Sequence, residues 1–185
     1  MLSSLFARRP AAPDPATWTP QGTTVVQRYR NALGEREGAV VLVYAGNGAR
    51  DTGYYAAACL GCTYRAASSG TRARLTEKEA ADLANEHATG CRAMNRGVPA
   101  APSTAHAANI VRDRLWGLRP HGTTHPHYVD LIDFHADRVD LQCPEAFITQ
   151  VMLHLVSSEP NFLASGSYDT GPGTRFRVLP HPRRR

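Results

Sequence analysis

The apolar and polar residues follow different patterns in the two halves of the chain. In the first half, the apolar run 39–45 and a second apolar segment, 54–59, flank a stretch rich in Gly, Asn and Asp. Apolar runs joined by such residues are typical of a buried β-hairpin. A helix is predicted over 74–91, where Thr76 precedes Glu79 by three residues and forms a capping box. The first half therefore predicts two strands followed by a helix.

The second half alternates apolar and polar residues over shorter segments. Segments 128–134 and 137–142 show the period of two that half-buried strands have. Segment 144–158 carries apolar residues four positions apart and begins at a proline, which predicts an amphipathic helix. Segments 162–168 and 174–180 predict a second hairpin. The order of elements in this half is therefore ββαββ.

Stretches rich in Pro, Gly and Ser divide the chain into parts. We expect a disordered basic arm at 1–22, a hairpin-and-helix unit at 23–96, a linker with a short helix at 97–126, a ββαββ unit at 127–180 and a basic tail at 181–185. The linker helix is expected over 103–116. Segment 23–33 fits a helix or a strand, and its pattern slightly favours a helix. Together these parts predict an α+β fold.

Composition places the chain among ordinary globular proteins. Hydrophobic residues make up 42% and charged residues 20% of the sequence, close to the usual averages. No apolar run approaches the length that crosses a bilayer, so no membrane partner is expected. In an export signal the positive charges come before a long apolar region, and the N-terminal residues do not follow that order. A cytoplasmic location with reduced thiols is therefore expected.

Basic residues outnumber acidic residues, 21 to 16, which gives a formal net charge of +5. Lys78 is the one lysine of the sequence, and all other basic residues are arginines. Arginine in place of lysine, with abundant Ala and Pro, is typical of a high-GC genome, such as that of an actinobacterium or of its plasmids and phages. Arginine binds phosphate through paired hydrogen bonds. The charge is therefore compatible with a nucleic-acid partner but does not by itself require one.

Two short motifs suggest a metal site. Cys59 and Cys62 form a C-x2-C turn at the exit of the predicted hairpin, and His87 and Cys91 form an H-x3-C motif on the predicted helix. Positions four apart lie on one face of a helix, and Ala84 on the same face indicates that it points inward. Three sulfurs and one nitrogen make a closed tetrahedral site that suits structural zinc. We therefore expect a zinc ion that joins the hairpin to the helix.

This arrangement resembles the ββα zinc fingers in their Cys-Cys-His-Cys form. The resemblance covers roughly residues 39–92 and implies that Cys59, Cys62, His87 and Cys91 are the ligands. Residues 63–86 separate the two motifs, about twice the usual distance of ~12 residues. The rule that assigns base contacts to helix positions therefore does not carry over.

Other interpretations of the cysteines stay open. A redox C-x-x-C usually begins a helix in a βαβ setting, whereas the motif at Cys59 follows a strand. A disulfide would require an oxidising compartment, for which the sequence gives no sign. Cys143 lies at the start of the predicted second helix, and no partner for it is evident.

Basic residues around the predicted finger indicate a nucleic-acid surface, with DNA favoured. The candidate contacts are Arg65, Arg72, Arg74, Lys78, Arg92 and Arg96. No nucleophile motif, phosphate-binding glycine loop or dinucleotide fingerprint is present. A DNA-binding regulator or accessory factor is therefore expected rather than an enzyme.

Two other classes of function remain at this point. The first is a protein-interaction module, in which the finger presents a surface to another chain or the C-terminal strands pair in a homodimer. The second is a metal-dependent hydrolase, in which His121, His125 and His127 would hold a second metal ion.

Overall fold

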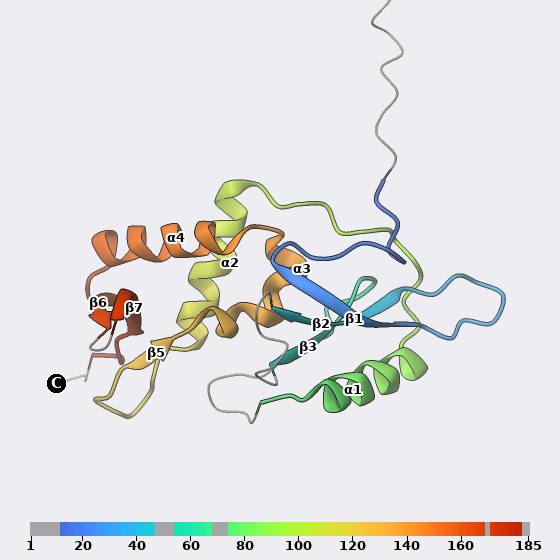
Figure 1. Ribbon diagram of the computed structural model, residues 1–185, viewed down its shortest axis with the longest axis horizontal. Coiled ribbons are helices and arrows are strands. Elements are labelled where there is room, and N and C mark those ends of the chain that lie inside the picture. Colours follow the sequence, from blue (N-terminus) through green and yellow to red (C-terminus); the bar gives the residue numbers. More distant parts are fainter. Residues whose placement is uncertain (1–11, 47–53, 68–73, 169–170, 183–185) are drawn as a thin grey trace, which may run out of the picture.

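The protein has an α+β fold, as predicted, with two antiparallel sheets (Figure 1). The computed structural model describes residues 12–46, 54–67, 74–168 and 171–182. The first unit contains β1 (Thr23–Arg30), β2 (Val40–Gly46), β3 (Tyr55–Cys59), β4 (Arg65–Ala67) and α1 (Glu77–Gly90). The second contains α2 (Thr104–Gly117), β5 (His127–Val129), the 3-10 helix η1 (Leu131–Asp137), α3 (Arg138–Leu141), α4 (Glu145–Ser158), β6 (Leu163–Tyr168) and β7 (Gly171–Val178).

The strand order of the first sheet is β1-β2-β3-β4. Its two central strands, β2 and β3, are covered on both faces. Every residue of β2 and β3 is buried, as the continuous apolar runs predict. Val41, Val43 and Cys59 face α1. Leu42 and Tyr44 face the opposite way, toward Val139 of α3. Because Cys59 lies on the α1 side of β3, its sulfur is directed at the helix.

The helix α1 is held close to this sheet by small side chains. Its predicted capping box is present, because the Thr76 hydroxyl accepts from the Glu79 amide and the Glu79 carboxylate accepts from the Thr76 amide. Ala80, Ala84 and Ala88 are buried against the sheet. Alanines at this spacing let the helix axis approach the strands. His87, one turn before the end of the helix, therefore comes near the end of β3.

The second unit has its own core between α2, α4 and a sheet in the order β5-β7-β6. Val111 and Leu115 of α2 meet Ile148 of α4 there, and Phe176 and Val178 of β7 close the core from the sheet side. The helix α2, which the sequence places in a linker, thus contributes to this core. The predicted hairpin of 162–168 and 174–180 is present as β6 and β7.

The segment 128–142 differs from its predicted pair of strands. Only 127–129 is a strand, and 131–141 is helical as η1 and α3. In α3, Val139 packs on the first sheet whereas Leu141 packs in the second core. Residues two apart lie on nearly opposite sides of a helix, so a helix between two cores shows the same alternation as a strand. The prediction of a second strand in the ββαββ unit was wrong for this reason.

The segment 23–33 is also not helical, because 23–30 forms β1 and pairs with β2. Its β-branched residues suit a strand, and this pairing gives β2 a neighbour on its second edge. Trp18, within the stretch predicted as a disordered arm, packs against the same buried cluster as Val25 of this strand. Residues 1–11 of that arm and 183–185 of the tail lie outside the described residues.

None of the helices that the structure describes has both the length and the apolar character needed to span a bilayer.

Candidate metal centre

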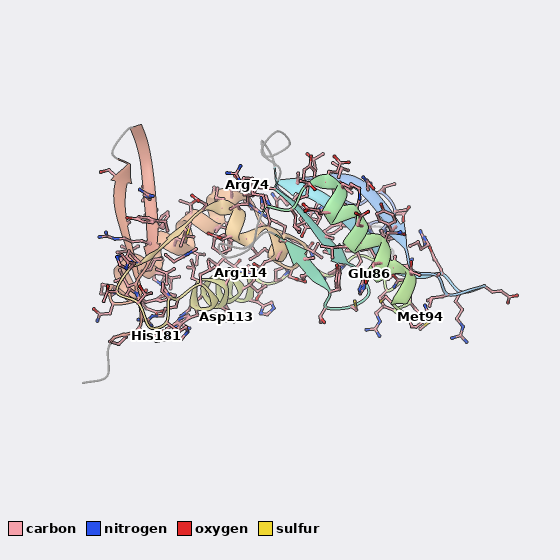
Figure 2. All side chains as sticks on the ribbon, turned by 90° about the horizontal axis from the view of Figure 1, so that it is seen from below. Arg74, Glu86, Met94, Asp113, Arg114 and His181 are labelled. Carbon is pink, nitrogen blue, oxygen red and sulfur yellow. The ribbon has the colours of Figure 1, made fainter. Side chains whose placement is uncertain are left out.

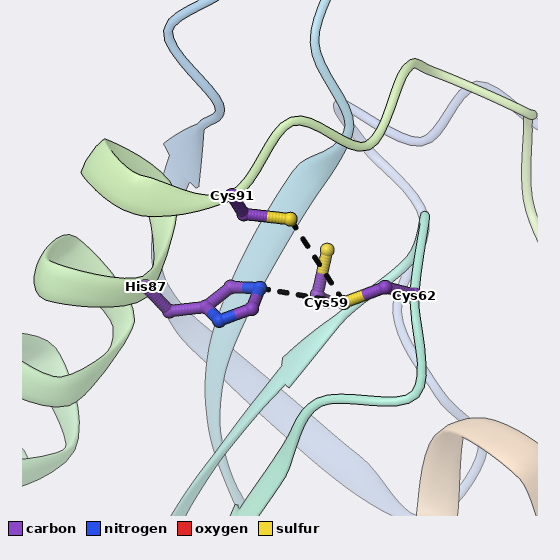
Figure 3. A group of neighbouring side chains, drawn as sticks. All are labelled: Cys59, Cys62, His87 and Cys91. Carbon is purple, nitrogen blue, oxygen red and sulfur yellow. Dashed lines mark hydrogen bonds between the residues drawn. The ribbon is translucent and has the colours of Figure 1, made fainter.

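Cys59, Cys62, His87 and Cys91 lie together where β3 ends and α1 ends (Figure 3). Their ligand atoms are all within 4.8 Å of one another. Cys59 is the last residue of β3, Cys62 lies in the turn before β4, and Cys91 is the C-cap of α1. The predicted cluster of three cysteines and one histidine is therefore confirmed as a group that could hold a metal ion.

The distances within this cluster fit a tetrahedral ion. The Cys62 Sγ lies 4.0 Å from the Cys91 Sγ and 3.4 Å from the His87 Nε2. Metal–ligand distances of about 2.3 Å for sulfur and 2.0 Å for nitrogen place tetrahedral neighbours about 3.8 Å apart (S–S) and about 3.6 Å apart (S–N). These two separations differ from the tetrahedral values by only a few tenths of an ångström. The other pairs of ligand atoms lie within 4.8 Å, so the group could hold one ion.

Each cysteine of the cluster receives a backbone N–H from the residue two positions later. Gly61 N–H donates to Cys59 Sγ (3.4 Å), Tyr64 N–H to Cys62 Sγ (3.4 Å), and Ala93 N–H to Cys91 Sγ (3.5 Å). Amides aimed at sulfur favour the thiolate over the thiol. Three such contacts around one point indicate a backbone shaped for negatively charged sulfur ligands.

The imidazole of His87 is fixed by packing. The Tyr64 ring stacks on it, with ring centroids 3.9 Å apart and planes inclined by 14°. Burial lowers the pKa of His87 below its usual value, so the ring is neutral near pH 7, and a neutral imidazole is the form that binds metal. Tyr64 thus holds Nε2 toward the sulfurs.

Burial raises the pKa of Cys59 to about 11 in the absence of an ion. This buried thiol is therefore protonated at neutral pH until a cation replaces the proton. Metal binding at the site is expected to release protons and to weaken as the pH falls.

Gly61 is required by close packing within the turn. A Cβ added at this position would lie 2.4 Å from the Ala39 Cβ and 2.9 Å from the Ala93 Cβ. The φ of Gly61 is not in the left-handed region. Glycine is therefore needed at this position for a steric reason: the turn lies directly against the two segments that flank the site.

Arg65 supports the turn from behind. Its Nη1 donates to the carbonyl oxygens of Cys59 (2.9 Å), Cys62 (3.2 Å) and Tyr64 (2.8 Å). Its other nitrogens bind Asp140 of α3. Arg65, Arg96 and Asp140 also line a cavity of about 540 Å³ beside Cys62.

The residues predicted to contact nucleic acid lie in several parts of the first unit, as far as the structure describes them. Arg65 is engaged with Asp140, Lys78 pairs with Asp82, and Arg74 lies over the Tyr54 ring. Arg92 and Arg96 are exposed, near the C-terminal end of α1. Arg74 and Met94 lie at opposite ends of that helix (Figure 2), so Arg92 and Lys78 are a helix length apart. Arg72 is outside the described residues.

The histidine loop does not form a second metal site among the residues that the structure describes. His121 stacks on His181, His125 pairs with the Thr123 hydroxyl, and His127 lies 3.7 Å from Asp133. Cys143 is buried in the second core, away from the cluster. Sequence reasoning missed Asp140 and the support role of Arg65, because that pair joins residues far apart in the chain.

Comparison of the chain with models of known families, with curated proteins and with solved structures finds no match.

Proposed function

We propose that the protein binds one structural zinc ion through Cys59, Cys62, His87 and Cys91 and that it is a DNA-binding protein. Zinc is favoured because it binds sulfur and imidazole ligands, whereas hard cations such as Mg²⁺ and Ca²⁺ prefer oxygen ligands. The set is also complete: four protein ligands leave no coordination position for water or substrate. The ion therefore joins α1 to the end of β3 rather than carrying out a reaction.

Metal analysis tests the zinc proposal directly. The purified chain should contain one equivalent of zinc, and Cys143→Ser should retain it, because Cys143 lies in the other core. Cys62→Ser should lose most of it, because one of the four ligands is removed. Equal zinc content in all three proteins would contradict the ligand assignment.

The observation that supports DNA binding is the arrangement of α3 and α4. The helical segment 131–141 ends at Gln142, which has a left-handed backbone (φ 43°, ψ 41°). Gln142 to Pro144 form a three-residue turn, after which α4 begins. Two helices joined by such a turn are typical of the helix-turn-helix motif, whose second helix enters the major groove of DNA. By this comparison α4 is the recognition helix.

The exposed side of α4 suits contact with base edges. Glu145 at its start pairs with Arg138, and no acidic residue follows it within the helix. The exposed residues are Ala146, Gln150, Leu153, His154, Ser157 and Ser158. In helix-turn-helix proteins the first turns of the second helix touch the bases, and glutamine can bind adenine through two hydrogen bonds. Gln150 is therefore the proposed base-reading residue.

Selection of preferred duplexes from a random pool tests this function. The zinc-loaded protein should enrich a short sequence, and Gln150→Ala should weaken binding to it by about 1–3 kcal/mol with loss of preference at one position. Asn85→Ala is the matched control, since it removes an amide from the exposed side of α1 and should leave binding unchanged. Equal effects of the two substitutions would contradict the role of α4.

A protein partner is the main alternative outcome. Leu153 is 45% exposed on α4, and an exposed leucine on a helix is also compatible with a docking face. Failure to bind DNA at low salt would favour that alternative.

A further inference from the structure

Two cysteines of the cluster lie close enough to react with each other. The Cys91 Sγ lies 4.0 Å from the Cys62 Sγ, and the two sulfurs point toward one another (Figure 3). A disulfide requires about 2.05 Å between its sulfurs, so each sulfur has to move by about 1 Å. Cys62 lies in the turn between β3 and β4, and Cys91 follows the last residue of α1. A movement of this size therefore breaks neither a strand nor the helix.

These two cysteines are also the more accessible ones. Cys62 and Cys91 are partly exposed, whereas Cys59 and Cys143 are buried. Oxidation of cysteine follows exposure and thiolate character. A dissolved oxidant therefore reaches Cys62 and Cys91 before it reaches the sulfur of Cys59, which lies between β3 and α1.

A cavity beside Cys62 opens a route for a small molecule to the cluster. Its volume is about 540 Å³, and it is lined by Cys62 and Thr63 of the turn, by Arg96 and Pro99 after α1, and by Asp140 of α3. Hydrogen peroxide is about as large as two water molecules, each of which occupies about 30 Å³. The cavity therefore leaves ample room for a hydroperoxide next to Cys62.

We propose that Cys62 and Cys91 form a redox site, which a hydroperoxide oxidises to a disulfide with release of the zinc ion. The inference rests on the proposed zinc site and adds a regulation of that site. With hydrogen peroxide, the Cys62 thiolate attacks one oxygen, the O–O bond breaks, and a sulfenic acid and a hydroxide ion form. The Cys91 thiolate then attacks the Cys62 sulfur, the S–S bond forms, and a second hydroxide ion leaves. The two thiolates lose two electrons, and the peroxide gains them.

Oxidation removes two of the four zinc ligands and replaces the link that the ion made. Cys59 and His87 alone do not complete a tetrahedral site, so the ion is released. The disulfide joins the turn after β3 to the end of α1, and it closes the segment 62–91, which contains all of α1, into a loop. The helix therefore stays attached to the turn after the ion has left, unlike in a protein from which a chelator removes the metal.

Peroxide titration of the full zinc-loaded chain is the test. Hydrogen peroxide should release one equivalent of zinc per chain, measured with a chromophoric zinc indicator. Peptide mapping after alkylation of free thiols should show one disulfide, between Cys62 and Cys91, and a thiol reductant with added zinc should restore the starting protein. Cys143→Ser is the matched control and should release zinc at the same rate, because Cys143 lies in the other core.

The outcomes separate this inference from the zinc proposal. If the chain holds zinc, and peroxide either leaves it bound or releases it without a Cys62–Cys91 disulfide, the redox site is wrong and the zinc site stands. A disulfide that joins Cys59 to Cys62, or slower release from Cys143→Ser, also overturns the redox site. If the purified chain cannot hold zinc but peroxide still joins Cys62 to Cys91, the zinc site is wrong and the reactive pair stands.

Discussion

Arg65 and Asp140 form a two-point ion pair that joins the turn after β3 to α3. The Arg65 Nε lies 2.8 Å from Asp140 Oδ2, and the Nη2 lies 2.7 Å from Oδ1. The Arg65 side chain is only 18% exposed, and its third nitrogen holds the carbonyl oxygens of Cys59 and Cys62. One guanidinium thus contacts the backbone of two cysteines of the candidate metal cluster and the helix α3.

We expect Arg65→Ala to lower the free energy of unfolding by about 2 kcal/mol, because two charged hydrogen bonds and three carbonyl contacts are lost from a largely buried site. Urea denaturation of the zinc-loaded protein measures this. Arg112→Ala is the matched control: Arg112 makes a similar two-point pair with Glu159 but is 41% exposed and binds no carbonyl in the described contacts. That pair should contribute at most about 1 kcal/mol, so equal losses would contradict a special role for Arg65.

Gly61→Ala should weaken zinc binding because the added Cβ would overlap the Ala39 and Ala93 side chains. The turn would have to move, and the sulfurs of Cys59 and Cys62 would move with it. Competition with a chromophoric chelator measures the zinc affinity, for which we expect a loss of tenfold or more, about 1.4 kcal/mol. Gly90→Ala, where a Cβ would meet nothing within 4 Å, should leave the affinity unchanged. Similar affinities for the two variants would show that the turn tolerates the methyl group.

Chelation of the metal should release α1 from the first sheet while the second core persists. Structural zinc sites contribute about 10–16 kcal/mol of apparent binding free energy, more than a small domain's whole stability. Amide hydrogen exchange should therefore become faster in β3 and α1 after chelation but change little at Ile148 and Met152 of α4, which belong to a separate core. Protection of α1 that survives chelation would mean that alanine packing alone holds the helix.

Acid should destabilise the protein through His135. Burial lowers the pKa of His135 to about 4, whereas in the unfolded chain it is about 6.5. Between these values the unfolded state binds the proton and the folded state does not, so stability falls as the pH drops from about 6.5 to about 4 and by at most about 3 kcal/mol. The substitution His135→Phe keeps a ring of similar size. It should reduce the slope of the unfolding free energy against pH in this range by the equivalent of one bound proton. An unchanged slope in that variant would contradict the assignment.

Local spacing was sufficient to predict the four residues of the candidate metal cluster and the helix that carries two motif positions. The motifs at Cys59 and His87 combine with the capping box of Thr76 and Glu79, and each of these features lies within five residues of sequence. The hairpin β2–β3 was predictable for the same reason, because its two strands are continuous apolar runs separated by turn residues.

The junction between the two units was not predictable in this way. Alternation in 137–142 arises because Val139 and Leu141 enter two different cores, and a sequence pattern does not say how many cores surround a segment. The pairing of Arg65 with Asp140 likewise depends on the packing of α3 on the first sheet. Arg65, which the sequence suggests as a phosphate contact, is bonded in the structure to Asp140 and to carbonyl oxygens of the turn.

X-ray absorption at the zinc edge of the purified protein tests the central claim most directly. The four-ligand centre predicts a first shell of three sulfurs at about 2.3 Å and one nitrogen at about 2.0 Å, with imidazole scattering from His87. The Cys91→Ser variant should show one sulfur fewer if it retains metal. A shell dominated by nitrogen and oxygen, or a protein that cannot be loaded with zinc, would contradict the account.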